Sequence, residues 1–370
     1  MPALPVPPPG PAWYPAVMGT GILATLLQLT SAGAGPLHDL AVAVLALAWL
    51  LLLVLSGLFA ARSLRVPGSL RATVTDTRVL PLWGTVAMGL LAVGAATSTV
   101  LPAVDAGLTG TAVALDAVLW TAGTVLGLAT AFGFSVALMR RSVGTPTLVW
   151  GLPIVPPMVS ATTGTAFAAH VGLTGRFLVV LVTTACFGVA LVLGVLVFGI
   201  GYHHHWRVDP VALVASPSTW IPLGIVGQST AAAQSIAAAT HGLLTPDTSR
   251  LVHDLAVGYG VVTLAAGAPL LGWAALVTVR GFRGRMPFTP GWWALTFPVG
   301  TLSLGSHLLG VATGRPSLVV LGAAFLTLLG LTWSLCAVAS VRAVARAHGP
   351  SESAGQHHVP VGHRVPEWSA

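Results

Sequence analysis

Charged side chains are scarce in this chain of 370 residues. Asp, Glu and Arg together make up 7% of it, lysine is absent, and only nine residues are acidic. A soluble domain carries charge on about a quarter of its residues, whereas here 55% are hydrophobic and the mean hydropathy is +0.88. The composition therefore excludes a soluble protein and predicts an all-α polytopic membrane protein.

The sequence also has little that would build a redox or metal site. Its two cysteines, Cys186 and Cys336, fall within apolar stretches and lack CxxC spacing. We interpret them as small core residues rather than as a disulfide or a metal pair. The His203–His205 run lies beside Trp206 at an expected membrane edge, where an interfacial role is favoured over metal binding. No metal and no cofactor are expected.

Tryptophan marks an internal repeat. Intervals of 70, 67, 70 and 72 residues separate five tryptophans, each of which opens an apolar stretch with Pro, Gly and Thr: Trp13, Trp83, Trp150, Trp220 and Trp292. At about 20 residues per membrane crossing, one repeat holds two helices and their loops. The repeat predicts ten transmembrane helices as five tandem helical hairpins, an array that favours a central pore.

The spacing of the charges gives the same number of spans. Division of the sequence at each Asp, Glu and Arg leaves ten charge-free windows of at least 22 residues, each able to cross ~30 Å of hydrocarbon. They are residues 1–38, 40–61, 79–104, 117–139, 142–175, 177–206, 210–246, 255–279, 286–314 and 316–341. The first helix of each hairpin begins near its Trp and is called a Trp-led helix below. The second helices are plainer Leu/Val/Ala spans, expected at about 40–62, 112–138, 176–201, 252–279 and 316–343.

The arginines predict the orientation of the chain. With the N-terminus inside, thirteen of the sixteen fall in cytoplasmic segments, and only Arg176, Arg250 and Arg315 fall outside. Both termini are therefore expected in the cytoplasm of a plasma-membrane protein, and the basic pI reflects topology rather than nucleic-acid binding. We expect a proline-rich lead at residues 1–11 without the features of a cleavable signal. A membrane domain at 12–345 and a disordered cytoplasmic tail at 346–370 follow.

The Trp-led helices contain the helix breakers of the sequence, including Pro15, Pro153, Pro156, Pro157, Pro222 and Pro298. In a membrane such residues are tolerated where neighbouring helices or a water-filled cavity satisfy the freed backbone groups. The Trp-led helices are therefore expected to kink and to line the interior, with the second helices facing lipid. Close packing through small residues is the alternative interpretation.

Two sets of repeat positions are candidates for pore lining. Five residues after each Trp the side chain is apolar, which predicts a hydrophobic ring that gates by dewetting at its one large aromatic, Phe297: Met18, Met88, Val155, Ile225 and Phe297. Fifteen residues after each Trp the side chain is polar: Gln28, Ser98, Thr165, Ser235 and His307. Ideal helices place the two sets about 80° apart, so both face the axis only if kinks rotate the helices. Further candidates for polar lining are Thr20, Thr85, Thr162, Ser229 and Thr301.

Fixed charge is missing from the predicted pathway. No Asp, Glu or Arg lies in the middle of a Trp-led helix, which excludes a charged anion fork and a carboxylate relay for protons there. Asp116 and Asp254 lie near the outer ends of second helices and are expected to reach the interface or a structural partner. Histidines at 170, 241 and 307 have no companion carboxylates, so a membrane-embedded enzyme is disfavoured.

Four segments resemble one known family. WYPAVMGTGILATLL (13–27), PLWGTVAMG (81–89), WIPLGIVGQ (220–228) and WWALTFPVGT (292–301) are similar to segments of the tellurite-resistance/dicarboxylate transporter family, over residues 11–345. That family includes the yeast malate and sulfite transporters and the plant slow-type anion channels. The resemblance implies ten helices around a pore, commonly in trimers, with a ninth-helix phenylalanine as plug, which is matched by Phe297. The MGTGI of the first helix is closer to the sulfite and malate exporters than to the plant channels.

We therefore expect a homotrimer that transports a small anion through a neutral central pore gated at Phe297. The anion would be a dicarboxylate such as malate, sulfite, tellurite or a monovalent inorganic anion. The alternative is a proton-coupled C4-dicarboxylate carrier in which His307, or the pair His253 and Asp254, titrates.

Overall fold

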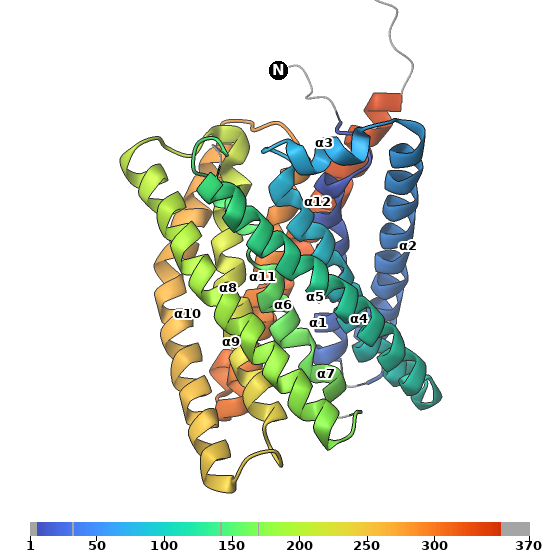
Figure 1. The fold of residues 1–370 in the computed structure, drawn as a ribbon, viewed down its shortest axis with the longest axis vertical. Helices are drawn as coiled ribbons and strands as arrows, with labels where there is room; N and C mark the ends of the chain where they lie inside the picture. The colour runs from blue at the N-terminus through green and yellow to red at the C-terminus, as the bar shows by residue number, and fades with distance from the viewer. Residues whose placement is uncertain (1–5, 32, 141–142, 169, 349–370) are drawn as a thin grey trace, which may run out of the picture.

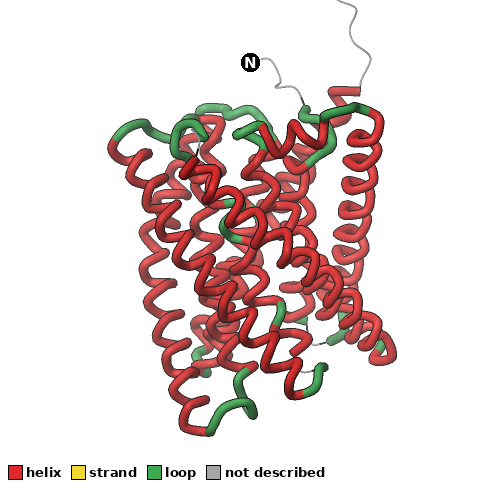
Figure 2. The backbone as a smooth tube through the Cα atoms, in the orientation of Figure 1, coloured by secondary structure: helices red, strands yellow, loops and turns green. Residues whose placement is uncertain are grey.

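A computed structural model describes residues 6–31, 33–140, 143–168 and 170–348, which form helices and loops without a strand (Figures 1 and 2). The α-helices are α1 (Tyr14–Thr30), α2 (Pro36–Arg65), α3 (Ser69–Thr75), α4 (Trp83–Val104), α5 (Thr109–Arg140), α6 (Pro156–Thr163), α7 (Thr165–Ala168), α8 (Leu173–Arg207), α9 (Ile221–Ala239), α10 (Pro246–Arg283), α11 (Phe297–Thr313) and α12 (Pro316–His348). Residues 346–348 prolong α12 into the predicted tail, and the rest of that tail lies outside the described residues.

A short 3-10 turn that contains or adjoins the repeat tryptophan precedes each Trp-led helix. These turns are η1 (Pro11–Trp13), η2 (Leu80–Leu82), η4 (Leu148–Gly151), η5 (Leu213–Trp220) and η6 (Pro290–Leu295), ahead of α1, α4, α6 with α7, α9 and α11. The prolines at 15, 156, 157, 222 and 298 all lie in the first turn of a helix. They start helices and do not kink them, contrary to the prediction, because the fixed φ and missing N–H of proline suit a first turn.

Burial separates the Trp-led helices from the second helices. Eight helical segments of the described chain are long and apolar enough to cross a membrane. In the three that contain α1, α4 and α11, 78%, 61% and 72% of the most apolar window is buried. In α2, α5, α8, α10 and α12 the share is 28%, 28%, 22%, 17% and 11%. The second helices therefore form the periphery, as predicted, with α2 and α10 at opposite edges and α5 and α8 across the front of Figure 1.

Two Trp-led helices, α6 and α9, are too short or too polar to be among these eight segments. The prediction of ten spans therefore needs both of them to cross the membrane as well. Helix α6 has eight residues and is separated from α7 at Gly164. Helix α9 contains Gln228 and Gln234, which lower its hydropathy. Almost all residues of α6 and most of α9 are nevertheless buried. Neighbouring helices surround them, so they need less hydrophobicity of their own.

Indole N–H groups tie the Trp-led helices to the second helices. Five such hydrogen bonds of 2.8–3.0 Å join the two sets: Trp49 to Thr97, Trp120 to the Ser160 carbonyl, Trp220 to Thr278, Trp293 to Ser340 and Trp333 to Thr20. A hydrogen bond between membrane helices contributes about 0.6 kcal/mol on average. Hydroxyl groups on the Trp-led helices therefore already serve packing.

The described part of the N-terminal lead is fixed at the end of the bundle where α12 also ends (Figure 1). The indole of Trp13 donates to the Pro7 carbonyl at 3.0 Å, and Arg62 of α2 donates to the Pro9 carbonyl at 3.3 Å. The first and last described segments therefore lie on the same side, as an even number of spans requires.

Candidate functional site

A cavity of about 270 Å³ lies where the five Trp-led segments meet. Each segment contributes to its wall, through Met18, Met88, Val155, Gly224 and Phe297 among others. The lead contributes Pro7 and the turn η1 contributes Ala12, so the cavity lies at the same end of the bundle as the N-terminal segment. Among the described residues, its lining holds no charged side chain and one side-chain hydroxyl, that of Ser218. The site is therefore a neutral, apolar vestibule on the axis of the repeat.

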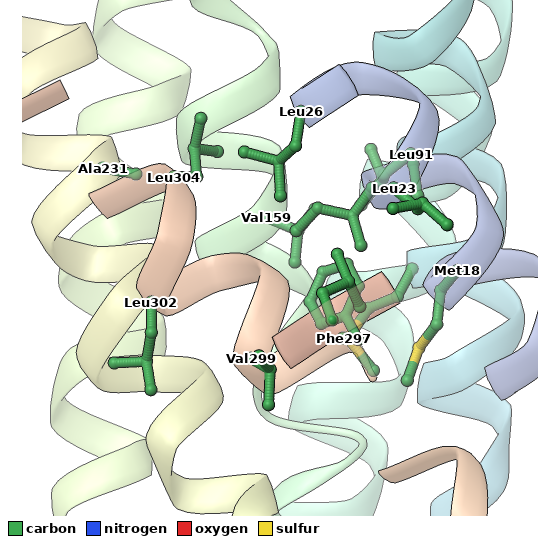
Figure 3. Packing of buried hydrophobic residues seen from close by; sticks show 14 of the residues in the cluster. Met18, Leu23, Leu26, Leu91, Val159, Ala231, Phe297, Val299, Leu302 and Leu304 are labelled. Carbon is green, nitrogen blue, oxygen red and sulfur yellow. The ribbon is translucent and has the colours of Figure 1, made fainter. Parts of the chain in front are cut away.

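Phe297 lies at the inner end of this vestibule. It is the first residue of α11, directly after the break that ends η6, and 3% of it is exposed. Figure 3 shows it next to Met18 within the largest cluster of buried apolar side chains, which also includes Val159 and Leu23. The aromatic ring therefore separates the vestibule from a closely packed apolar layer.

Four of the five residues in the predicted hydrophobic ring line the vestibule, and Ile225 does not. The Cδ1 of Ile225 occupies the space beside Gly194 of α8, on the outer side of α9. In α1 the cavity is lined by Pro15 and Met18, which are two and five residues after Trp13. In α9 it is lined by Ile221 and Gly224, which are one and four residues after Trp220. Helix α9 is thus offset by one residue, or about 100° of rotation.

The second predicted set, fifteen residues after each Trp, does not form one ring. Gln28 is bound to Ser31 at 3.1 Å and to His38 at 2.9 Å, at the connection between α1 and α2. The Gln28 amide therefore stabilises the loop between α1 and α2 and does not line the vestibule. The Cβ of His307 lies against Gly322 of the second helix α12.

The other three members of that set differ in their surroundings. Ser98 donates to the Ala95 carbonyl at 3.1 Å, and Thr165 donates to the Thr162 carbonyl at 2.8 Å. Ser235 is half-buried on α9. The 80° offset between the two sets leads to this scatter, because the helices are not kinked enough to turn both toward the axis.

The remaining predicted polar residues are engaged in packing. Thr20 accepts from Trp333 and donates to the Ala16 carbonyl, and Thr85 donates to the Pro11 carbonyl of the lead at 3.0 Å. Thr301 donates to the Pro298 carbonyl at 2.7 Å. These hydroxyl protons are already committed to carbonyl oxygens.

Two further hydroxyls of that group lie on different faces of their helices. Thr162 donates to the carbonyl of Gln228, which joins α6 to α9 at 3.3 Å. Ser229 follows Ile225 by four residues and Val226 by three, and these two pack outward against α8 and α10. Ser229 therefore lies on the outer face of α9, away from the vestibule.

The titratable residues of the second helices lie in different surroundings. Asp116 is fully buried where α5 meets Gly94 of α4, and its carboxylate lies near the Ser98 hydroxyl of the same helix α4. It does not reach the interface, and the polar side chain beside it is Ser98 of α4, so the structural partner is the predicted alternative that fits Asp116. Asp254 is exposed and His253 half-buried on α10. In the described part of the chain, no three His, Cys, Asp or Glu residues come together as a metal-binding group.

Gln228 is a functional candidate that the repeat positions did not identify. It is 2% exposed on α9, and its Oε1 has no hydrogen-bond partner among the described residues. The available signal was an amide within a Trp-led helix, eight residues after Trp220 and therefore in neither of the sets five and fifteen residues after each Trp.

Comparison with known proteins connects this architecture to transport. Residues 10–341 match the family model described as SLAC1, voltage-dependent anion channel. The sulfite efflux pump SSU1 of Trichophyton rubrum is 25% identical over 339 residues, which cover 88% of each protein. The sulfite efflux pump SSU1 of Arthroderma otae is 26% identical over 337 residues, or 87% of each. An uncharacterized transporter of Methanocaldococcus jannaschii is 22% identical over 310 residues, 80% of this chain and 82% of that protein.

Proposed function

Because this chain belongs to the SLAC1 family of voltage-dependent anion channels, we propose that it moves a small anion across the membrane between its five Trp-led helices, past a gate at Phe297. The observation that carries the proposal is the vestibule, to which all five repeats contribute and whose lining includes the Phe297 ring. Ten spans in five hairpins follow if α6 with α7 and α9 cross the bilayer inside the ring of second helices.

We propose sulfite as the first substrate to test, with other small oxoanions and chloride as alternatives. The support is that the two fungal relatives are sulfite efflux pumps and that MGTGI (18–22) is similar to the sulfite and malate exporters. The vestibule offers no fixed cation that would bind a dicarboxylate such as malate by two points. A neutral pathway of this kind binds weakly and favours passage over capture.

The proposed protein is a homotrimer of the plasma membrane with both termini in the cytoplasm. Orientation rests on the arginine distribution and on the shared side of the first and last described segments. The trimer rests on the family resemblance alone, and native mass spectrometry of the purified protein tests it.

Flux into proteoliposomes tests the function. Sulfite, chloride, nitrate, tellurite and malate should each be supplied with and without a pH gradient, beside liposomes that lack the protein. We expect sulfite flux that follows its own gradient and the membrane potential. A flux that needs the pH gradient and is abolished in His307→Ala would favour the proton-coupled dicarboxylate carrier instead. Absence of protein-dependent flux for every anion would refute both.

A further inference from the structure

The direction of Gln228 follows from its neighbours along α9. Ile225 packs against Gly194 of α8, Val226 against Gly267 of α10, and Gly227 against the backbone of α11. At 100° per residue, Gln228 points 100° away from Gly227 and so away from α11. It points within about 40° of Gly224, which lies one turn earlier and lines the vestibule. The Gln228 side chain therefore occupies the interior face of α9.

The side-chain oxygen Oε1 of Gln228 is buried and unpaired, and its Nε2 donates none of the hydrogen bonds found among the described residues. Apart from the backbone hydrogen bonds of α9, one hydrogen bond among the described residues involves Gln228. The Thr162 hydroxyl donates it to the main-chain oxygen of Gln228, not to the side chain. Most buried polar side chains have a partner, so each exception needs an explanation. Gln234, six residues later, also has an unpaired Oε1, and it differs at the nitrogen, because its Nε2 donates to the Ala256 carbonyl of α10 at 2.7 Å.

The hydroxyls near the pathway cannot take the place of this amide. Thr162, Thr301 and Thr20 each donate their single proton to a backbone carbonyl. An anion needs donors, and a glutamine amide has two N–H groups. Gln228 is therefore the side chain on the interior face of α9 whose donors are uncommitted.

The level of Gln228 places it beyond the gate. Gly224 packs against Pro298 and Gly227 against the backbone of Thr301, so Gln228 lies about five residues, or ~7.5 Å along the helix, beyond the level of Phe297. We propose that the Gln228 side-chain amide binds the permeating oxoanion as it passes Phe297 and loses water. This inference rests on the proposed function and adds the residue that recognises the anion.

Sulfite flux into proteoliposomes, measured against sulfite concentration, tests the role of Gln228. We expect Gln228→Leu to raise the half-saturating sulfite concentration at least tenfold, equivalent to about 1.4 kcal/mol. Gln228→Glu, of the same size but negatively charged, should abolish the flux. Gln234→Leu is the matched control and should keep the wild-type concentration dependence. Thermal unfolding of each variant shows whether the protein is folded.

The outcomes separate this inference from the proposed function. If the wild type carries sulfite and Gln228→Leu keeps its half-saturating concentration, or if Gln234→Leu changes it equally, Gln228 does not recognise the anion and the pathway itself stands. If Gln228→Leu and Gln228→Glu both fold but lose flux to the same extent at every concentration, the amide has a structural role and the inference is overturned. If the wild type carries no anion, the proposed function fails first.

Discussion

Replacement of Phe297 by alanine removes the side chain that separates the vestibule from the apolar layer beyond it. The ring is 3% exposed and borders a cavity of about 270 Å³. Burial of a phenylalanine side chain stabilises a packed state by about 1.5–3 kcal/mol. If that packing holds the pathway closed, its loss shifts the ratio of closed to open states by about ten- to a hundredfold. We expect sulfite flux in Phe297→Ala to rise by a factor in this range.

Phe297→Ala also lowers the stability of the fold, so the control is a substitution that destabilises the protein equally at a site away from the vestibule. Removal of a buried Phe side chain destabilises a core by about 3–5 kcal/mol. Phe134 of α5 is 1% exposed and packs against Trp150 in a separate cluster away from the vestibule. Phe134→Ala should lower the thermal midpoint without an increase in flux, and Phe297→Leu should give flux between wild type and Phe297→Ala. Equal flux in Phe297→Ala and wild type, with both folded, would refute the gate.

Three further substitutions test the packing that holds the pathway. Trp333→Phe removes the hydrogen bond to Thr20, so thermal unfolding should show a loss of about 0.6–1 kcal/mol with flux unchanged; altered selectivity would mean that Thr20 faces the anion. Gly227→Ala places a methyl group on the backbone of α11, and we expect a large fall in folded protein on size-exclusion chromatography, whereas Gly272→Ala, with open space around it, should behave as wild type. Asp116→Asn removes a fully buried carboxylate whose polar neighbour is the Ser98 hydroxyl, which is too little to offset the burial of a charge, so the thermal midpoint at pH 8 should rise by a few degrees. A fall would show that the interaction with Ser98 stabilises the fold by more than burial of the charge costs.

The sequence allowed prediction of those features that depend on periodicity and hydropathy. The tryptophan spacing located the Trp-led segments, and the second helices run a few residues past their predicted bounds, as in Thr109–Arg140 for 112–138. The scarcity of charge predicted the neutral lining of the vestibule. Phe297 was reached by the repeat count and by the family motif, and the structure places it beside Met18 at the inner end of the cavity.

The features that sequence could not give depend on rotation and on hydrogen-bond partners. Ile225 and Ser229 face outward because α9 is turned by one residue relative to α1, and residue spacing does not record such a rotation. Thr20 and Thr85 were read as pore lining from their polarity, yet their protons bind backbone carbonyls. A single sequence also gave no reason to select Gln228, because an unpaired amide is recognised only when its surroundings are known.

Blockage of the vestibule by a thiol reagent tests the central claim, that the anion passes between the Trp-led helices. Gly224 lines the cavity and has room for a side chain, whereas Gly188 of the second helix α8 has open space around it. In a protein with Cys186 and Cys336 replaced by serine, Gly224→Cys and Gly188→Cys should be modified with a bulky thiol reagent before sulfite flux is measured. We predict that modification at Gly224→Cys stops the flux and that modification at Gly188→Cys leaves it unchanged. Undiminished flux through fully modified Gly224→Cys would contradict the account.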